Sequence, residues 1–312
     1  MAFVNPQYLV EPDWLHAHLG EVVVLDVTAM LTSKLENRAL AECFEPAHIP
    51  GSHFLDVASG YGDLSAPDAV LPWTWPSADR FAATMERFGI SNDTRVVIVA
   101  RTPRDGIDNG TMWCTRAWWT MHHGGVDCAI LNGGIEHWEA KGLPMTDAPA
   151  ETPPPGSFTP KADWQRGHAG RDDVLAGVES ADTCLVDALA PESFDGTSAG
   201  YGPRKGHITS AINVPMGAFV TGNTARFRSD DEIEAILRDS GLLDAPRVIT
   251  YCGGAIAATV DAFALALFGH DDVSVYDGSL MEWTTDAALP MTDPTPTPPE
   301  RAEKVSDSLF DR

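Results

Sequence analysis

Residues 247–269 read RVITYCGGAIAATVDAFALALFG, and this stretch decides the fold. Its first part, residues 247–252, is a compact apolar run flanked by polar residues, which is typical of a buried parallel strand. Two glycines follow, and residues 257–269 then carry apolar side chains at helical spacing as far as Gly269, a helix stop signal. A strand, a glycine loop and a helix in this order indicate an α/β fold with a mainly parallel sheet.

The same pattern occurs earlier in the chain, because RVVIVA at 95–100 matches RVITYC at 247–252. Four other pairs of segments recur in the same order: VVVLDVT (with Asp26) and TCLVDAL (with Asp187), EPAHIPGSHFLDV (with His48) and RKGHITSAINVPM (with His207), LNGGIEHW (131–138) and YDGSLMEW (276–283), and LPMT (143–146) and LPMT (289–292). Solenoids need more and shorter repeats, so two copies of one domain are the simpler interpretation. We therefore predict two α/β domains, each a mainly parallel sheet flanked by helices.

The repeat and the proline content predict the domain boundaries. We expect a first domain at residues 8–146 and a second at 165–293. Residues 147–164 are rich in proline and read as an extended linker outside both cores. Residues 294–312 form a proline-rich tail that we expect to wrap the surface or to be loose.

Composition excludes several classes of partner. The chain of 312 residues has 45 acidic and 21 basic residues, a formal net charge of −24, which argues against nucleic acid and anionic membranes as partners. The five cysteines are scattered and form no C-x-x-C pair, so we predict neither a disulfide framework nor a structural zinc site. With no secretory signal and no apolar run of membrane length, a reducing cytoplasm fits best.

Cys252 is the candidate nucleophile, because it ends a strand at a loop that runs into a helix. The loop glycines let backbone N–H groups turn inward, and the helix N-terminus adds its positive end. Both effects stabilise an anionic sulfur and predict a lowered thiol pKa. The predicted active-site loop consists of Gly253, Gly254, Ala255, Ile256 and Ala257. Such a nest can hold the terminal sulfur of a persulfide as well as a thiolate.

Two other interpretations of Cys252 are open. A buried cysteine at a strand end is often inert packing. The same strand–Cys–loop–helix arrangement serves cysteine-dependent phosphatases, whose C-x5-R motif grips phosphate with an arginine. Here that position is Ala258 and the loop carries no cation, so phosphoester chemistry is poorly supported.

The ordered set of motifs resembles the rhodanese family, and the whole chain resembles its two-domain thiosulfate and 3-mercaptopyruvate sulfurtransferases. The resemblance covers roughly residues 8–293. Its landmarks are GHITSAINVP (206–215), CGGAIA (252–257) and YDGSLMEW (276–283) in the second half, with HIPGSHFLD (48–56), TRAWWTM (115–121) and LNGGIEHW (131–138) in the first.

The resemblance implies that Cys252 carries sulfur as a persulfide and that the first domain is not catalytic, since Ala100 occupies the equivalent position. It also implies an active site between the domains, to which the first domain contributes one wall. Its nearby cations are Arg101, Arg104 and Arg116, and for Arg116 we favour a salt-bridging role. No metal ion and no organic cofactor is implied. The implied partners are a small sulfur donor and an acceptor thiol, cyanide or protein dithiol.

The sulfur donor stays open between thiosulfate and 3-mercaptopyruvate. The uncharged loop and Ser279 resemble the mercaptopyruvate enzymes, yet the family's two substrate arginines are replaced by Leu189 and Ser193. Arg204 and Lys205 are the remaining local candidates for a substrate anion, with ordinary loop cations as the equal alternative. Because these arginines are lost, a sulfur-carrier or persulfide-sensing module with little turnover is the alternative function.

The paired histidines and aspartates have a simpler interpretation. His48 and His207 occur in both copies, although only one copy has the cysteine. Asp26 and Asp187 recur in the same way. This symmetry predicts structural hydrogen bonds rather than catalysis.

Overall fold

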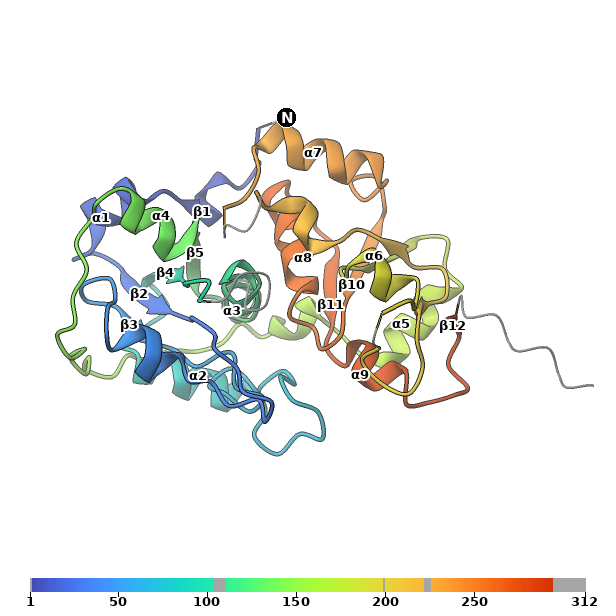
Figure 1. Cartoon of the computed structure of the whole chain (residues 1–312), viewed down its shortest axis with the longest axis horizontal. Coiled ribbons are helices and arrows are strands. Elements are labelled where there is room, and N and C mark those ends of the chain that lie inside the picture. Colours follow the sequence, from blue (N-terminus) through green and yellow to red (C-terminus); the bar gives the residue numbers. More distant parts are fainter. Residues whose placement is uncertain (1, 104–109, 199, 222–225, 294–312) are drawn as a thin grey trace, which may run out of the picture.

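The computed structural model describes residues 2–103, 110–198, 200–221 and 226–293, and it contains two five-stranded parallel sheets (Figure 1). The first sheet has the order β1-β5-β4-β2-β3, with β1 Leu9–Val10, β2 Val23–Asp26, β3 His53–Phe54, β4 Arg95–Val99 and β5 Asp127–Leu131. The second has the order β6-β11-β10-β7-β9, with β6 His168–Ala169, β7 Thr183–Asp187, β9 Ile212–Asn213, β10 Arg247–Tyr251 and β11 Val273–Tyr276. Matching strands occupy matching places, so the sequence repeat is a repeat of structure. β8 (His207–Ile208) and β12 (Met291–Thr292) pair separately as an antiparallel ribbon.

Helices flank both sheets, as predicted. In the first half these are α1 Pro12–His18, α2 Ala78–Arg87, α3 Gly110–Gly124 and α4 Gly134–Ala140; in the second they are α5 Arg171–Val178, α6 Pro191–Phe194, α7 Asp230–Asp239, α8 Ala258–Leu267 and α9 Ser279–Trp283. Helix α8 follows the glycine loop and ends before Gly269, which adopts the left-handed φ of +74°. Helix α7 begins at a capping box, in which Ser229 accepts from the backbone of Glu232.

The faces of the first sheet bury two separate apolar clusters. One face packs against α1 and α4 through side chains such as Leu15, Ile135 and Trp138. The other face packs against α2 and α3, and its cluster continues into the second domain. Strand residues alternate between these clusters, as Val97 and Ile98 do, because successive side chains of a strand point to opposite faces.

Helices α3 and α8 form the centre of the contact between the two domains (Figure 1). The hydroxyls of Thr115 and Thr259 lie 2.8 Å apart and are fully buried. The rings of Trp118 and Phe263 meet edge to face, with centroids 4.7 Å apart. This contact fixes the first domain against the helix that follows Cys252.

The predicted linker is extended, but it is not separate from the cores. Phe158 and Trp164 are both buried, and Trp164 stacks on Phe81 of α2 with ring centroids 5.4 Å apart. The prediction that residues 147–164 lie outside both cores is therefore wrong, because two aromatic side chains dock into the first domain. The exact boundaries stay predictions, and the tail at 294–312 lies outside the described residues.

The recurring histidines and aspartates have the predicted structural roles. The Nδ1 atoms of His48 and His207 lie 2.8 and 2.9 Å from the carbonyl oxygens of Phe44 and Phe194, on whose rings the histidines stack. The carboxylates of Asp26 and Asp187 each accept a backbone N–H two residues further on. The two pairs thus fix the backbone at equivalent places in the two domains.

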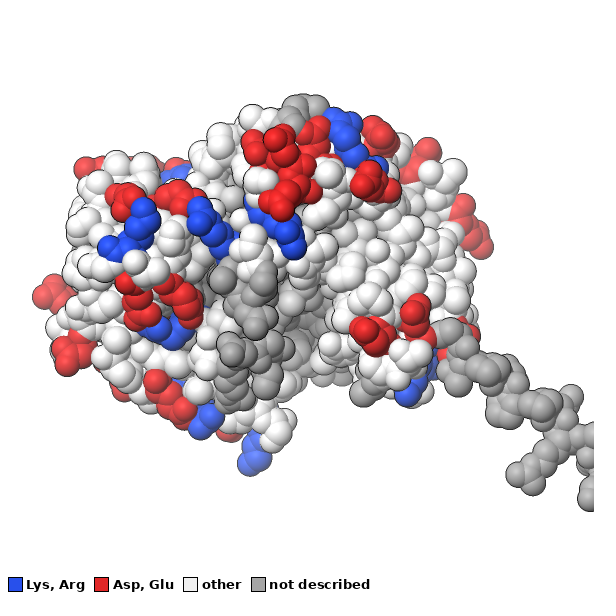
Figure 2. All heavy atoms as spheres, turned by 45° about the horizontal axis from the view of Figure 1, so that its top comes forward, with Lys and Arg blue, Asp and Glu red and all other residues white. Residues whose placement is uncertain are grey.

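Figure 2 shows one face of the surface, on which acidic and basic groups are interspersed with the acidic groups in excess, in keeping with the net charge of −24. In the described part of the chain, every helix falls short of the length and apolar content that a bilayer crossing requires.

Candidate active site

The candidate site is built around the sulfur of Cys252, at the point where β10 ends and the loop to α8 begins. Backbone N–H groups of Gly254, Ile256 and Ala258 face this sulfur and lower the pKa of its thiol. The loop therefore surrounds one atom with three donors and places it beside the first turn of α8. Such a nest favours negative charge on the sulfur without any charged side chain.

Burial acts against this nest. Cys252 is only 3% exposed, and burial raises the pKa of its thiol above the ordinary value, while the N–H groups of Ala258, Gly254 and Ile256 lower it. The nearby carboxyl group of Asp187 raises it further. The net direction is upward, so the predicted lowering of the pKa is wrong. The sequence indicates the nest but does not reveal how much protein covers it.

Two of the three donors are aimed by backbone contacts within the second domain. Met281 N–H donates to the carbonyl of Gly253, and Val260 N–H donates to that of Ala257, each at 3.0 Å. The C=O and the following N–H of a trans peptide point in opposite directions. Holding these two carbonyls outward therefore directs the N–H groups of Gly254 and Ala258 inward, toward the sulfur.

Ser279 lies beneath the loop, where the sequence predicts a substrate contact. Its hydroxyl is fully buried, donates to the carbonyl of Tyr276 at 2.8 Å, and accepts from the N–H groups of Cys252 and Ala255 at 3.2 and 3.1 Å. With its donor and both acceptor positions occupied, the hydroxyl braces the loop. The predicted substrate contact is thus corrected to a structural support for the nest.

Aromatic side chains cover the loop from both domains. The ring of Tyr201 lies directly on Gly253, where an added Cβ would be 2.2 Å from two ring atoms. The ring of Trp73, from the first domain, lies against Gly254 in the same way, and a Cβ added there would be 3.1 Å from it. Burial raises the pKa of the Tyr201 hydroxyl, and the adjacent Cys252 raises it further. Sequence reasoning missed Tyr201, because it stands in a short glycine-rich segment without periodicity.

Comparison with known proteins agrees with this geometry. The rhodanese-like domain model matches residues 171–286, which include the loop. The chain is 33% identical over 250 residues to the thiosulfate sulfurtransferase of Gallus gallus, covering 80% of this chain and 82% of the relative. This chain belongs to the tandem-domain rhodanese family of sulfurtransferases.

Two further relatives span nearly the whole rhodanese chain. The sulfur carrier protein TtuD of Thermus thermophilus is 30% identical over 307 residues, covering 93% of this chain and 98% of its own. The crystal structure of the 3-mercaptopyruvate sulfotransferase SseA from Escherichia coli superposes with a TM-score of 0.74 at 26% identity, covering 87% of this chain and 98% of its own. Family membership therefore includes both transferases and a carrier.

The two predicted substrate cations, Arg204 and Lys205, differ in their surroundings. Arg204 is half-buried, and its Nη1 donates to the carbonyls of Asp286 and Leu289 at 2.9 Å each, so it ties down a neighbouring segment. Lys205 is exposed. Leu189 and Ser193, which replace the family's arginines, add no charge. Substrate binding by Arg204 and Lys205 stays a prediction.

The equivalent loop of the first domain is different in character. Ala100, the counterpart of Cys252, is fully buried. Arg101 makes a bidentate ion pair with the Glu139 carboxylate, at 2.9 and 2.8 Å. Arg104 lies outside the described residues. The salt-bridging role favoured for Arg116 is confirmed by a 3.1 Å contact with Asp277 of the second domain.

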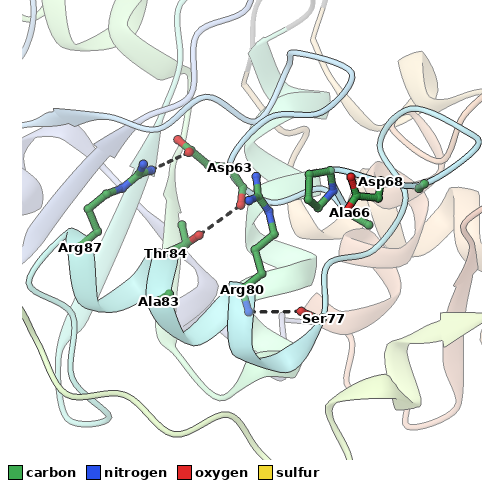
Figure 3. Close-up of a pocket in the computed structure, with 10 residues that line it drawn as sticks. Asp63, Ala66, Asp68, Ser77, Arg80, Ala83, Thr84 and Arg87 are labelled. Carbon is green, nitrogen blue, oxygen red and sulfur yellow. Dashed lines mark hydrogen bonds and ion pairs between the residues drawn. The ribbon is translucent and has the colours of Figure 1, made fainter.

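The rhodanese also has a cavity of about 790 Å³ on its first domain, lined by α2 and the segment around residues 63–69 (Figure 3). Both arginines that line it have partners: Arg87 pairs with Asp63 at 2.6 Å, and Arg80 donates to the carbonyl of Gly62 at 2.9 Å. Neither Cys252 nor any residue of its loop lines this cavity. The cavity and the candidate active site are therefore separate features.

Proposed function

We propose that this rhodanese moves a sulfane sulfur from a small donor, thiosulfate or 3-mercaptopyruvate, to an acceptor thiol, cyanide or protein dithiol through a persulfide on Cys252. The observation that carries the proposal is the set of three backbone donors aimed at the Cys252 sulfur. Arranged donors of this kind stabilise charge on the atom that they surround. Sulfurtransferase relatives covering most of the chain support the same class of reaction.

The first half-reaction is a displacement at sulfur. The Cys252 thiol loses its proton, and the thiolate attacks the sulfur that the donor transfers. With 3-mercaptopyruvate, the C–S bond breaks, pyruvate leaves as its enolate with the bonding electrons, and the enolate takes the proton of the new persulfide. With thiosulfate, the donor S–S bond breaks, sulfite leaves with the bonding electrons, and Cys252 becomes a persulfide anion. The outer sulfur of a persulfide is more acidic than a thiol, so the nest holds the product as an anion although burial disfavours the free thiolate.

The second half-reaction returns the enzyme to its starting state. An acceptor thiolate or cyanide attacks the outer sulfur, and the electrons of the persulfide S–S bond return to the Cys252 sulfur. The same residue accepts and releases the group, so ping-pong kinetics are expected. No step requires a metal ion or an organic cofactor. We place the reaction in a reducing cytoplasm, where the Cys252 thiol stays available for sulfur transfer.

Intact-protein mass spectrometry after exposure to thiosulfate or 3-mercaptopyruvate tests the proposal. We expect a gain of one sulfur atom that a reductant removes. Cys252→Ser should abolish both this gain and turnover, whereas Cys184→Ser, at a half-buried thiol on β7, should retain both. A Cys252→Ser protein that still takes up the labile sulfur would overturn the assignment.

A carrier function is the second candidate, and the similarity to the Thermus thermophilus sulfur carrier over 93% of this chain favours it. A carrier accepts one sulfur and keeps it until a protein partner arrives. Steady-state assays with several donors and small acceptors separate the two functions. A transferase turns over many times, and a carrier stops after one sulfur for each Cys252.

A further inference from the structure

Arg116 of the first domain reaches into the loop that carries Cys252. It lies on α3, the helix that packs against α8 between the two domains (Figure 1), and its side chain is only 2% exposed. The guanidinium donates to three acceptors: the carbonyl of Ala255 at 3.3 Å, the carbonyl of Trp73, and the Asp277 carboxylate at 3.1 Å. One buried cation thus joins the first domain, the active loop and the end of β11.

The contact with Ala255 has a directional effect. The carbonyl of Ala255 and the N–H of Ile256 belong to one peptide unit and point in opposite directions. The Ile256 N–H is one of the three donors to the Cys252 sulfur. By holding the Ala255 carbonyl, Arg116 turns the Ile256 N–H toward the sulfur.

This peptide depends on outside support more than its neighbours do. The two other donating peptides are held by the backbone N–H groups of Met281 and Val260, within the second domain. Ala255 instead adopts a φ of +61°, a left-handed conformation that costs an alanine free energy. Its N–H is held by Ser279 and its carbonyl by Arg116, so side chains on both sides keep it in place.

We infer that Arg116 is a positioning residue for sulfur transfer, through which the non-catalytic domain aims one of the three backbone donors at the Cys252 sulfur. This inference rests on the proposed function and assigns a role to the first domain within it. Arg116 touches no reacting atom and acts through the Ala255–Ile256 peptide. Asp277 holds the guanidinium in this position, because its carboxylate balances the charge of Arg116 and also accepts the backbone N–H of Trp75 at 2.6 Å.

The test compares Arg116→Met, Arg116→Lys and the double variant Arg116→Met/Asp277→Asn. The double variant removes both charges together, so that no unpaired carboxylate is left buried. The control is Asn132→Ala, which removes another hydrogen bond between the domains, to the Phe227 N–H at 3.0 Å, without touching the loop. For each variant, the rate of Cys252 alkylation by iodoacetamide is measured against pH by peptide mass spectrometry, together with the rate of sulfur loading from thiosulfate.

Loss of one donor to an anion should raise the midpoint of the alkylation profile by about one pH unit and slow sulfur loading about tenfold near neutral pH. Both variants with the methionine substitution should show this shift, Arg116→Lys should give a smaller one, and Asn132→Ala should behave like the wild type. A folded double variant with an unchanged midpoint overturns the role of Arg116. If the wild type takes up no sulfur, the proposed function fails, while the alkylation profile still decides whether Arg116 aims the donor.

Discussion

Replacing Ser279 by alanine tests whether the loop is braced from below. The Ser279 hydroxyl is the common acceptor for the N–H groups of Cys252 and Ala255, and it also donates to the carbonyl of Tyr276. Alanine fills nearly the same space but leaves these groups unpaired in a fully buried site. Ser279→Ala should therefore destabilise the second domain and loosen the nest around the sulfur.

The size of the effect follows from the groups left unpaired. Each buried N–H without an acceptor costs about 1–3 kcal/mol. The bonds from Cys252 and Ala255 are long, at 3.2 and 3.1 Å, which places each near the lower end of that range. The free energy of unfolding should fall by about 2–3 kcal/mol. A loss of about 1.4 kcal/mol in stabilisation of the reacting sulfur would slow sulfur loading about tenfold.

Ser274→Ala provides the matched control. Ser274 is 2% exposed on the adjacent strand β11, and its hydroxyl has no hydrogen-bond partner within the described residues. Removing an unpaired buried hydroxyl should change the free energy of unfolding by less than about 0.5 kcal/mol, or raise it. Urea unfolding and the rate of sulfur loading are measured for both variants. Equal stability and equal rates in the two would refute the bracing role of Ser279.

Three further predictions concern the cover, the titration and the linker. Tyr201→Ala removes the ring over the loop, and Gly253→Ala displaces that ring, so both variants should speed alkylation of Cys252 severalfold. The control Tyr61→Ala, at a ring that is 50% exposed, should leave the alkylation rate unchanged. Burial raises the pKa of the Asp187 carboxyl to about 6, so between about pH 4 and 6 the folded protein keeps this proton while the unfolded chain loses it. The free energy of unfolding of the wild type should therefore fall as the pH rises through that interval, and Asp187→Asn should gain about 3 kcal/mol relative to the wild type over the same interval in urea titrations. A difference between the two proteins that does not change with pH would contradict the assignment. Trp164→Ala should lower the free energy of unfolding by about 3–5 kcal/mol if the linker docks as described, whereas Trp14→Ala, at a ring 37% exposed, should change it little.

The repeat and the main elements could be predicted because they depend on local pattern. The apolar run before Cys252 and the helical spacing after it are visible in one stretch of sequence, and β10 and α8 occupy those places. The structural roles of His48 and His207 could be predicted because symmetry between the copies separates them from a cysteine that only one copy has. Periodicity and symmetry are properties of the sequence itself.

The features that sequence reasoning missed depend on contacts between distant segments. Arg116 and Asp277 are 161 positions apart, and nothing in either motif indicates that they meet. The upward direction of the Cys252 pKa comes from burial, to which Tyr201 and Trp73 contribute from separate segments. A serine that binds substrate and a serine that braces a loop look the same in a sequence, so the motif assigns Ser279 to the wrong partner.

The interdomain contacts give a physical reason for a non-catalytic first domain in a chain with one catalytic cysteine. Helix α8 carries apolar side chains around its whole circumference, which is typical of a helix covered on every side. Its own sheet covers one side, and α3 covers the side that bears Thr259 and Phe263. Without α3 this side would face water, and the Ala255 carbonyl would lose the guanidinium that holds it. The first domain therefore supports the nest in two ways, by burying the helix that follows Cys252 and by orienting the peptide that points at its sulfur.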